Sequence, residues 1–115
     1  MLKTSYKFKV EYPYDVRKAE SMRIRHKYPT KIPIILEDNE TGRYNKYLIC
    51  DNMSVGKLLY TIRMNTGIKS SEAIFMYINN NFIPSSNELL KKIYETNMDE
   101  DGYLYIRYAR ENTFG

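Results

Sequence analysis

The spacing of apolar residues predicts helices in three parts of the chain. The clearest one follows Ser54, a credible N-cap, since its apolar residues recur three, four and seven positions apart. This stripe consists of Val55, Leu58, Leu59 and Ile62, and the helix can close at Thr66-Gly67. Two basic helices are expected over 4–10 and 14–27, separated by Pro13, with Val16, Ala19 and Met22 as the apolar stripe of the second. A short helix is expected over 86–95.

Strand-like alternation occurs in four places. Residues 31–37 are rich in β-branched side chains and apolar on both alternating faces, which predicts a strand that is covered on both sides. Turn-forming residues at 38–42 and the alternation over 44–50 predict a hairpin with it. A short strand over 74–78, a turn over 79–81 and a two-faced strand over 103–108 complete the pattern.

The order of these elements predicts the fold. From the third element onward it is the order of the β-grasp fold of ubiquitin, so we predict an α+β, ubiquitin-like domain with a four-stranded mixed sheet and two additional N-terminal helices. The long helix can cover one face of the sheet and the N-terminal pair the other. We expect one domain over 1–115, with a helical subdomain at 1–28, a β-grasp core at 29–109 and a flexible tail at 110–115.

Composition narrows the class of protein. The 115 residues fit one domain, and 43% hydrophobic with 28% charged residues is ordinary for a globular protein. One cysteine excludes an internal disulfide, and the N-terminus lacks the apolar run of a secretory signal, which favours the reducing cytosol. The net charge of +4 is concentrated in the N-terminal quarter, which suits nucleic acid, anionic lipid or an acidic peptide.

Candidate catalytic and metal-binding residues are few. His26 lies in a basic run, where a solvated helix position is the simpler interpretation than a catalytic base. Cys50 follows an apolar strand and is interpreted as a small packing residue. The acidic run 99–101 precedes a glycine and is interpreted as a solvated turn rather than a cation site. We therefore expect no enzyme activity, no metal and no cofactor.

The C-terminal sequence is more informative. The last strand leads through residues 109–113 to Phe114 and Gly115. A terminal glycine carboxylate has no side chain beside it, so it can thread a narrow enzyme channel, be adenylated, pass to a thiol and acylate an amine. The ordinary alternative is a frayed chain end.

Several segments together match one protein family. They are Ile24–Pro29, Ile32–Glu37, Lys46–Ile49, Val55-Gly56, Ile62-Arg63, Asp99–Tyr105 and Glu111–Gly115. On these segments the chain resembles the GABARAP and light-chain-three family of autophagic ubiquitin-like modifiers over nearly its whole length.

The resemblance implies conjugation of Gly115 to the amine of phosphatidylethanolamine by ubiquitin-like activating and conjugating enzymes. It also implies a processing and delipidating cysteine protease that recognises Phe114 and Gly115. The protein would then be a substrate throughout, cytoplasmic before lipidation and afterwards peripheral on autophagosomal or related vesicle membranes.

The resemblance further implies a docking strand over residues 46–50 for autophagy receptors and adaptors with an aromatic-x-x-aliphatic motif. The aromatic pocket would be lined by Glu20, Ile24, Pro33, Leu48 and Tyr103, with Lys31 and Lys46 facing acidic residues of the motif. The aliphatic pocket would use Tyr47, Ile49, Met53, Leu58 and Ile62, with Arg63 also in the site. Leu58 and Ile62 are equally well explained as core. Thr61, Cys50 and Asn65 depart from the family pattern, which predicts a shallower and less basic second pocket.

Two other classes of function stay open at this point. An unconjugated peptide-binding adaptor in vesicle traffic or microtubule association would use the basic N-terminal helices. An RNA-binding domain would use the basic patch and the 12 tyrosines, although strand packing explains most of those tyrosines.

Overall fold

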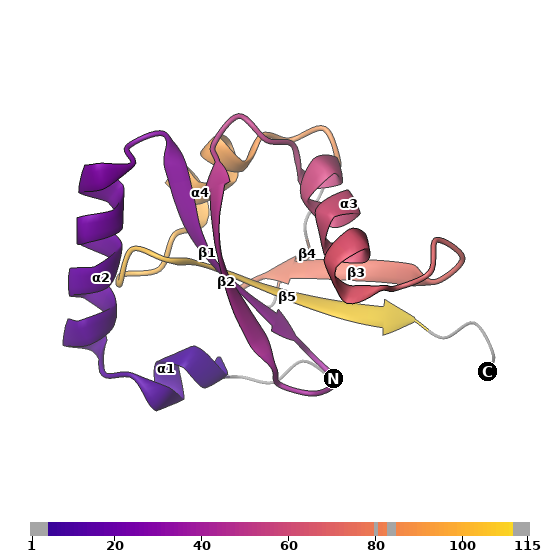
Figure 1. The fold of residues 1–115 in the computed structure, drawn as a ribbon, viewed down its shortest axis with the longest axis horizontal. Helices are drawn as coiled ribbons and strands as arrows, with labels where there is room; N and C mark the ends of the chain where they lie inside the picture. Colours follow the sequence, from indigo (N-terminus) through magenta and orange to yellow (C-terminus); the bar gives the residue numbers. More distant parts are fainter. Residues whose placement is uncertain (1–4, 80, 83–84, 112–115) are drawn as a thin grey trace.

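The protein consists of a mixed β-sheet with helices on both of its faces (Figure 1). The structure is a computed structural model, and it describes residues 5–79, 81–82 and 85–111. In chain order the elements are α1 (Lys7–Glu11), α2 (Tyr14–Lys27), β1 (Lys31–Asp38), β2 (Tyr44–Cys50), α3 (Val55–Thr66), β3 (Ala73–Ile78), β4 (Asn81–Phe82), α4 (Leu90–Asn97) and β5 (Leu104–Glu111). α1 and α2 cover one face, and α3 and α4 cover the other (Figure 1).

The strand order of the sheet is β2-β1-β5-β3-β4. β1 pairs antiparallel with β2 and parallel with β5, and β3 pairs antiparallel with β5, so the predicted four-stranded mixed sheet is confirmed. β4, a fifth strand of two residues, was not predicted, because Asn81 was assigned to a turn. The turn is shorter than expected: Asn79 takes the left-handed conformation with φ 51°, and Asn81 already pairs with Ile78.

Each face of the sheet has its own hydrophobic core. β1 contributes to both, as its two-faced pattern predicted, since Ile34 packs toward α3 and Ile35 packs toward α1. The core under α3 and α4 is mainly aliphatic. The core under α1 is largely aromatic, and the Phe8 ring centroid lies 5.2 Å from that of Tyr103.

α3 confirms the helix predicted from spacing and capping. The Ser54 side chain accepts a hydrogen bond from the Lys57 amide at 3.1 Å, and Gly67 ends the helix at φ 71°. Leu58 and Ile62 are completely buried, and burial of each side chain stabilises the fold by about 2 to 3 kcal/mol.

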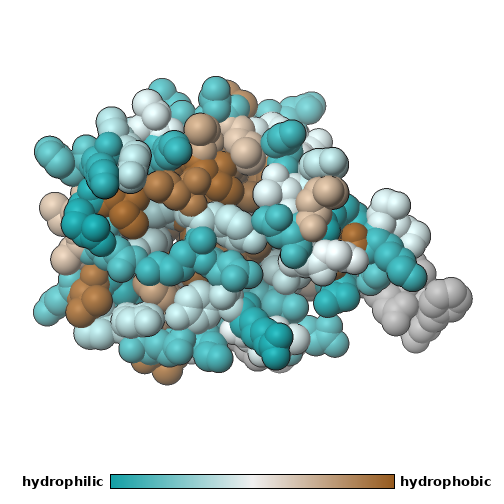
Figure 2. Space-filling model, viewed as in Figure 1, coloured by the Kyte–Doolittle hydropathy of each residue, from teal (hydrophilic) through white to brown (hydrophobic). Residues whose placement is uncertain are grey.

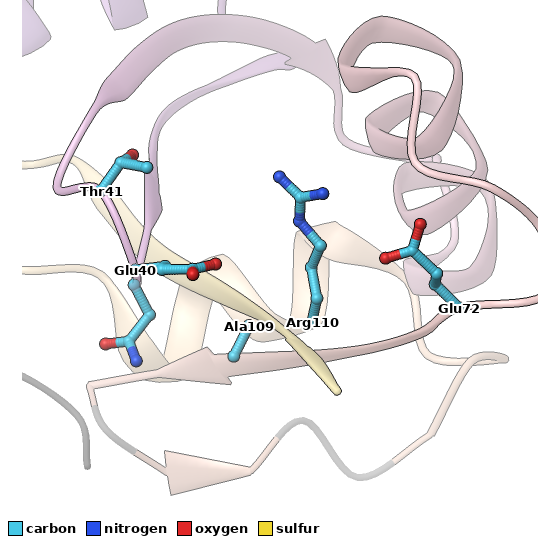
Figure 3. Close-up of a pocket in the computed structure, with 6 residues that line it drawn as sticks. Glu40, Thr41, Glu72, Ala109 and Arg110 are labelled. Carbon is cyan, nitrogen blue, oxygen red and sulfur yellow. The ribbon is translucent and has the colours of Figure 1, made fainter. Parts of the chain in front are cut away.

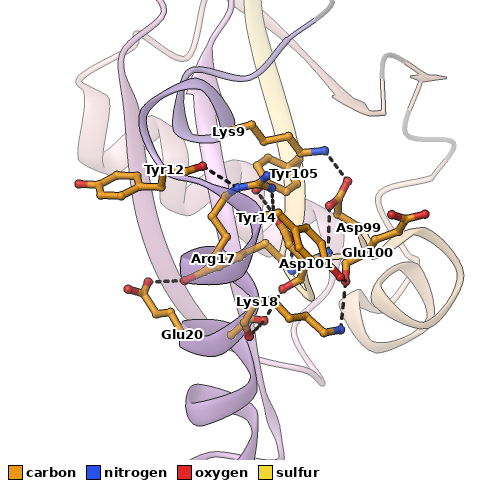
Figure 4. A network of polar contacts seen from close by, with 12 residues as sticks. Lys9, Tyr12, Tyr14, Arg17, Lys18, Glu20, Asp99, Glu100, Asp101 and Tyr105 are labelled. Atoms are coloured by element: carbon orange, nitrogen blue, oxygen red, sulfur yellow. Dashed lines mark hydrogen bonds and ion pairs between the residues drawn. The ribbon is translucent and has the colours of Figure 1, made fainter.

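The predicted apolar stripe of α2 was wrong. Val16 and Met22 are 49% and 60% exposed, and the helix buries Arg17 and Ser21 instead. Arg17 donates to the Asp101 side chain, and the Ser21 hydroxyl donates to the Asp101 carbonyl (Figure 4). α2 therefore packs on the sheet partly through polar side chains, which a search for apolar spacing does not detect.

The acidic run 99–101 forms the predicted turn, but of its three side chains only that of Glu100 is solvated as expected. Asp101 is completely buried, and Asp99 forms an ion pair with Lys9 of α1 at 2.5 Å (Figure 4). Burial acts to raise the pKa of Asp99, but the hydrogen bonds from Lys9 and from Asp101, together with the positive charge of Lys9, outweigh it and lower the pKa below its ordinary value. These two carboxylates connect both N-terminal helices to the turn before β5.

Three smaller differences concern ends of elements and one side chain. Cys50 is exposed rather than packed, because it ends β2 at the edge of the sheet. α4 begins at Leu90, because the carbonyls of Ser86 and Glu88 instead accept hydrogen bonds from the amides of Gly56 and Val55 at the start of α3. β5 continues through Glu111, two residues past the expected end of the β-grasp core.

Candidate functional site

The candidate docking strand lies at the edge of the sheet. β2 is the outermost strand beside β1, and no other described strand pairs with its outer edge. An edge strand presents unpaired N–H and C=O groups to which an extended peptide can add. The successive side chains of β2 point to opposite faces, so the two predicted pockets lie on opposite faces of the same strand.

The predicted aromatic pocket combines α2 with the start of the sheet. Pro33 of β1 is the Cα partner of Leu48 of β2, which places both side chains on the face that α2 covers. Leu48 is 38% exposed and Ile24 is half-buried, so both are accessible to a ligand. Pro33 and Tyr103 are buried, and Tyr103 is only 1% exposed, which makes them part of the floor.

Glu20 is the electrostatic centre of this pocket. Its carboxylate accepts a hydrogen bond from the Tyr103 hydroxyl and forms an ion pair with the Lys46 ammonium at 2.5 Å. Burial acts to raise the pKa of Glu20, but the hydrogen bonds from Lys46 and Tyr103, together with the positive charges of Lys46 and Arg23, outweigh it and lower the pKa. Burial and the neighbouring Glu20 carboxylate both raise the pKa of Tyr103, which keeps that hydroxyl a donor.

The two predicted lysines have different surroundings. Lys46 is exposed, and its ammonium lies 5.2 Å from the centroid of the Phe8 ring, so α1 helps to place it. This contact could not be predicted from the sequence, because Phe8 and Lys46 are far apart in the chain. Lys31 lies at the start of β1 with its ammonium 5.6 Å from the Tyr28 ring centroid, and its carbonyl accepts a hydrogen bond from Arg25 at 2.6 Å.

The predicted aliphatic pocket lies on the α3 face and is mostly core. Ile49, Leu58 and Ile62 are at most 7% exposed. Tyr47 and Met53 are partly buried against them and are the accessible members of the set. The structure therefore brings the predicted residues together, but Leu58 and Ile62 lie beneath the surface.

Two polar residues of α3 border this region. Asn65, one of the residues that depart from the family pattern, donates a hydrogen bond to the Tyr47 hydroxyl at 3.4 Å. Arg63 donates to the Lys69 carbonyl at 2.7 Å, so its guanidinium is engaged with the loop after α3. Figure 2 shows apolar surface gathered between α2 and α3, over β1 and β2.

The remaining predictions concern the chain end, metals and membranes. Phe114 and Gly115 lie outside the described residues. Among the described residues, no group of three metal-ligating side chains comes together. No helix in the described part of the chain combines the length and the apolar content needed to cross a membrane.

The strand order of the sheet, with α3 packed across one face, defines a ubiquitin-like β-grasp protein. A solved structure titled "Crystal Structure of Trypanosoma brucei ATG8" matches with a TM-score of 0.82 at 30% identity, covering 96% of this chain and 99% of that one. The family model described as "Autophagy protein Atg8 ubiquitin like" matches residues 16–115.

Two relatives give the same result at the level of sequence. Autophagy-related protein 8e of Arabidopsis thaliana is 42% identical over 113 residues, which is 94% of this chain and 92% of the relative. Autophagy-related protein 8 of Neosartorya fischeri is 43% identical over 114 residues, which is 95% of this chain and 96% of the relative. The chain belongs to the Atg8 family of ubiquitin-like autophagy proteins.

Proposed function

We propose that this protein is an autophagy modifier that is conjugated to phosphatidylethanolamine through Gly115 and recruits receptors through β2. The observation that carries the docking part is the position of β2, an edge strand with candidate pockets on both of its faces. Membership of the Atg8 family supports the conjugation part.

The docking mechanism is strand addition to β2. A receptor segment with an aromatic-x-x-aliphatic motif pairs its backbone with the outer edge of β2. The aromatic side chain enters between Ile24 and Leu48, above Pro33 and Tyr103. The aliphatic side chain lies on the opposite face, against Tyr47 and Met53, with Ile49, Leu58 and Ile62 beneath them.

The positive charges beside the aromatic pocket favour a motif with acidic residues. Lys31 and Lys46 flank the aromatic pocket, and Lys46 already pairs with Glu20. An acidic residue of the ligand can pair with Lys31 and, in competition with Glu20, with Lys46, so the two lysines favour ligands that carry a carboxylate. Arg63 contributes positive charge nearby on α3.

In the conjugation reaction the protein is the substrate. The activating enzyme adenylates the Gly115 carboxylate with ATP and releases pyrophosphate, and a cysteine thiol of that enzyme then displaces AMP to form a thioester. The acyl group passes to a thiol of the conjugating enzyme and finally to the amine of phosphatidylethanolamine, which forms an amide and releases the conjugating enzyme's thiol. A cysteine protease hydrolyses the bond after Phe114 and Gly115. This chain supplies no catalytic residue and no cofactor, and lipidation moves it from the cytoplasm to autophagosomal or related vesicle membranes.

Intact-protein mass spectrometry of the membrane fraction tests the proposal under conditions that induce autophagy. We expect a phosphatidylethanolamine adduct on the C-terminal peptide of the native protein and none in a Gly115→Ala variant. An unmodified terminus in a protein that still binds the acidic aromatic-x-x-aliphatic peptide would refute conjugation and favour the unconjugated adaptor. Leu48→Ala serves as the control, because it lies in the docking site and should leave lipidation intact.

A further inference from the structure

β1 and β3, the two strands beside β5, pair with different lengths of it. Its parallel pairing with β1 ends at Asp38↔Tyr108, whereas its antiparallel pairing with β3 continues to Ala73↔Glu111. Among the described residues, the last part of β5 therefore has a strand on the β3 side only.

The backbone of Arg110 faces the side that lacks a strand. The Tyr108 carbonyl accepts a hydrogen bond from the Asn39 amide at 2.9 Å, so the backbone groups of Tyr108 point toward β1. The N–H and C=O of alternate residues in a strand point the same way, so those of Arg110 point in this direction too. Beyond Asn39 no described strand lies opposite them.

The turn after β1 leaves this space open. Asp38 accepts hydrogen bonds from the Gly42 amide through its carbonyl and from the Glu40 amide through its carboxylate, both at 2.8 Å, which turns the chain away from β5. The result is a groove of about 640 Å³, which we call the β5 groove (Figure 3). Its lining residues are Asn39, Glu40, Thr41, Glu72, Ala109 and Arg110.

The charge of the β5 groove differs in sign from that of the whole protein. Figure 3 shows the Arg110 side chain between the carboxylates of Glu40 and Glu72. In the described part of the chain, no ion pair joins Arg110 to either carboxylate. The groove thus presents two carboxylates and one guanidinium in a protein with a net charge of +4. This local excess of negative charge beside an open strand edge favours a basic ligand.

We propose that the β5 groove is a second strand-addition site, which binds a short extended segment of a protein partner that carries a lysine or arginine. The segment occupies the place that β1 leaves, pairs with the backbone of Arg110, and directs its basic side chain to Glu40 and Glu72. Its position is separate from β2, because β1 lies between β2 and β5 in the sheet. Binding at the β5 groove requires neither lipidation nor docking at β2.

An NMR titration tests the site with a blocked peptide of alternating threonine and valine around a central arginine. In the isotope-labelled protein we expect saturable shifts of the amides of Ala109, Arg110 and residues 39–41. The matched peptide has glutamate in place of arginine and should bind at least about tenfold more weakly, a difference of about 1.4 kcal/mol. Glu40→Gln combined with Glu72→Gln should weaken the arginine peptide to a similar extent, with the remaining amide spectrum unchanged as proof of folding.

Three results would overturn the proposal. The first is the absence of shifts at these amides up to about 1 mM peptide, or shifts confined to β2. The second is equal affinity for the glutamate peptide. The third is a concentration-dependent shift of the same amides without peptide, which would assign the groove to a second copy of the chain.

Hydrogen exchange of the free protein supplies an independent check that needs no ligand. We expect the Arg110 amide to exchange much faster than the amide of Ala109, which faces β3. Equal protection of the two amides would mean that the edge of β5 is already covered, and this would also overturn the proposal.

Discussion

The Arg17 guanidinium of α2 donates a hydrogen bond to the carboxylate of Asp101, a side chain that is 0% exposed. The same carboxylate accepts hydrogen bonds from the Tyr105 hydroxyl and, at 2.9 Å, from the Tyr103 amide (Figure 4). We call these four residues the Asp101 network. It fixes α2 against the start of β5 and therefore holds Glu20 and Ile24, which are on the same helix, near the candidate docking strand.

Replacing Asp101 with asparagine should strongly destabilise the protein. The substitution keeps the shape of the side chain but leaves the Arg17 charge, which is 10% exposed, without its counter-ion. Removing one partner of a buried ion pair costs about 3 to 5 kcal/mol. Chemical denaturation of Asp101→Asn should show a loss of this size in the free energy of unfolding.

An exposed ion pair provides the matched control for this measurement. Lys92 and Glu88 of the α4 region are 3.6 Å apart, and the Lys92 side chain is 72% exposed. Lys92→Gln should change the free energy of unfolding by less than about 1 kcal/mol, because solvent screens the pair. Similar losses for Asp101→Asn and Lys92→Gln would mean that the Asp101 network does not hold α2 in place.

The glycine next to Asp101 should tolerate no side chain. Gly102 has φ 91°, and a Cβ atom added there would lie 2.3 Å from the Ser21 hydroxyl oxygen. This hydroxyl donates a hydrogen bond to the Asp101 carbonyl, so it is held in place. Gly102→Ala therefore adds a steric clash to the strain of a left-handed backbone, which costs about 1 to 3 kcal/mol by itself.

Gly67→Ala separates the clash from the strain. Gly67 has a similar φ of 71°, but an added Cβ would meet no atom within 4 Å. Thermal or chemical denaturation should show a clearly larger loss of stability for Gly102→Ala than for Gly67→Ala. Equal losses would show that Ser21 moves aside and that the contact between α2 and this turn is loose.

Much of the fold could be predicted because its signals are local. The capping of α3 by Ser54 and its termination at Gly67 involve neighbours in the chain, and the alternation of β1 reports burial on two faces directly. For the same reason, β4 was missed. It is two residues long and has no periodicity of its own, so only its pairing with β3 reveals it.

The buried face of α2 could not be predicted because its partners are distant in the chain. Arg17 and Asp101 are 84 positions apart, and a charged residue on a helix looks solvated until its partner is known. The docking residues show the same limit. Their identity came from a family resemblance, whereas the contact of Lys46 with Glu20 and Phe8 required the three-dimensional structure.

The ion pair of Glu20 makes part of the stability dependent on pH. The folded-state pKa of Glu20 is lowered, so its carboxylate stabilises the fold above the unfolded-state pKa, which is about 4.3. That contribution is lost as the pH falls through the folded-state pKa. In urea denaturation, the native protein should exceed Glu20→Gln in free energy of unfolding at neutral pH, and the gap should close below about pH 4.

A control substitution tests whether the change in the free energy of unfolding comes from the contacts of Glu20 in the pocket. Glu40→Gln removes an exposed carboxylate that has no ion-pair partner in the described part of the chain. At neutral pH the gap between the native protein and Glu40→Gln should be smaller than the gap for Glu20→Gln, because Glu40 is exposed and lacks such a partner. A gap for Glu20→Gln that stays constant down to about pH 3 would contradict the role assigned to the contacts of Glu20 with Lys46 and Tyr103.

Leu48→Ala should weaken binding of an acidic peptide with tryptophan and leucine three positions apart by about 2 kcal/mol or more, or roughly thirtyfold in Kd. Leu48 is 38% exposed on β2 opposite Pro33, so its truncation removes pocket surface while leaving the core intact. Calorimetric titration measures the effect, and unchanged thermal unfolding verifies the fold. Met98→Ala is the control, because it truncates a side chain that is 52% exposed outside the candidate site. Equal affinity of the Leu48→Ala and Met98→Ala variants would place the docking of the aromatic side chain elsewhere on the molecule.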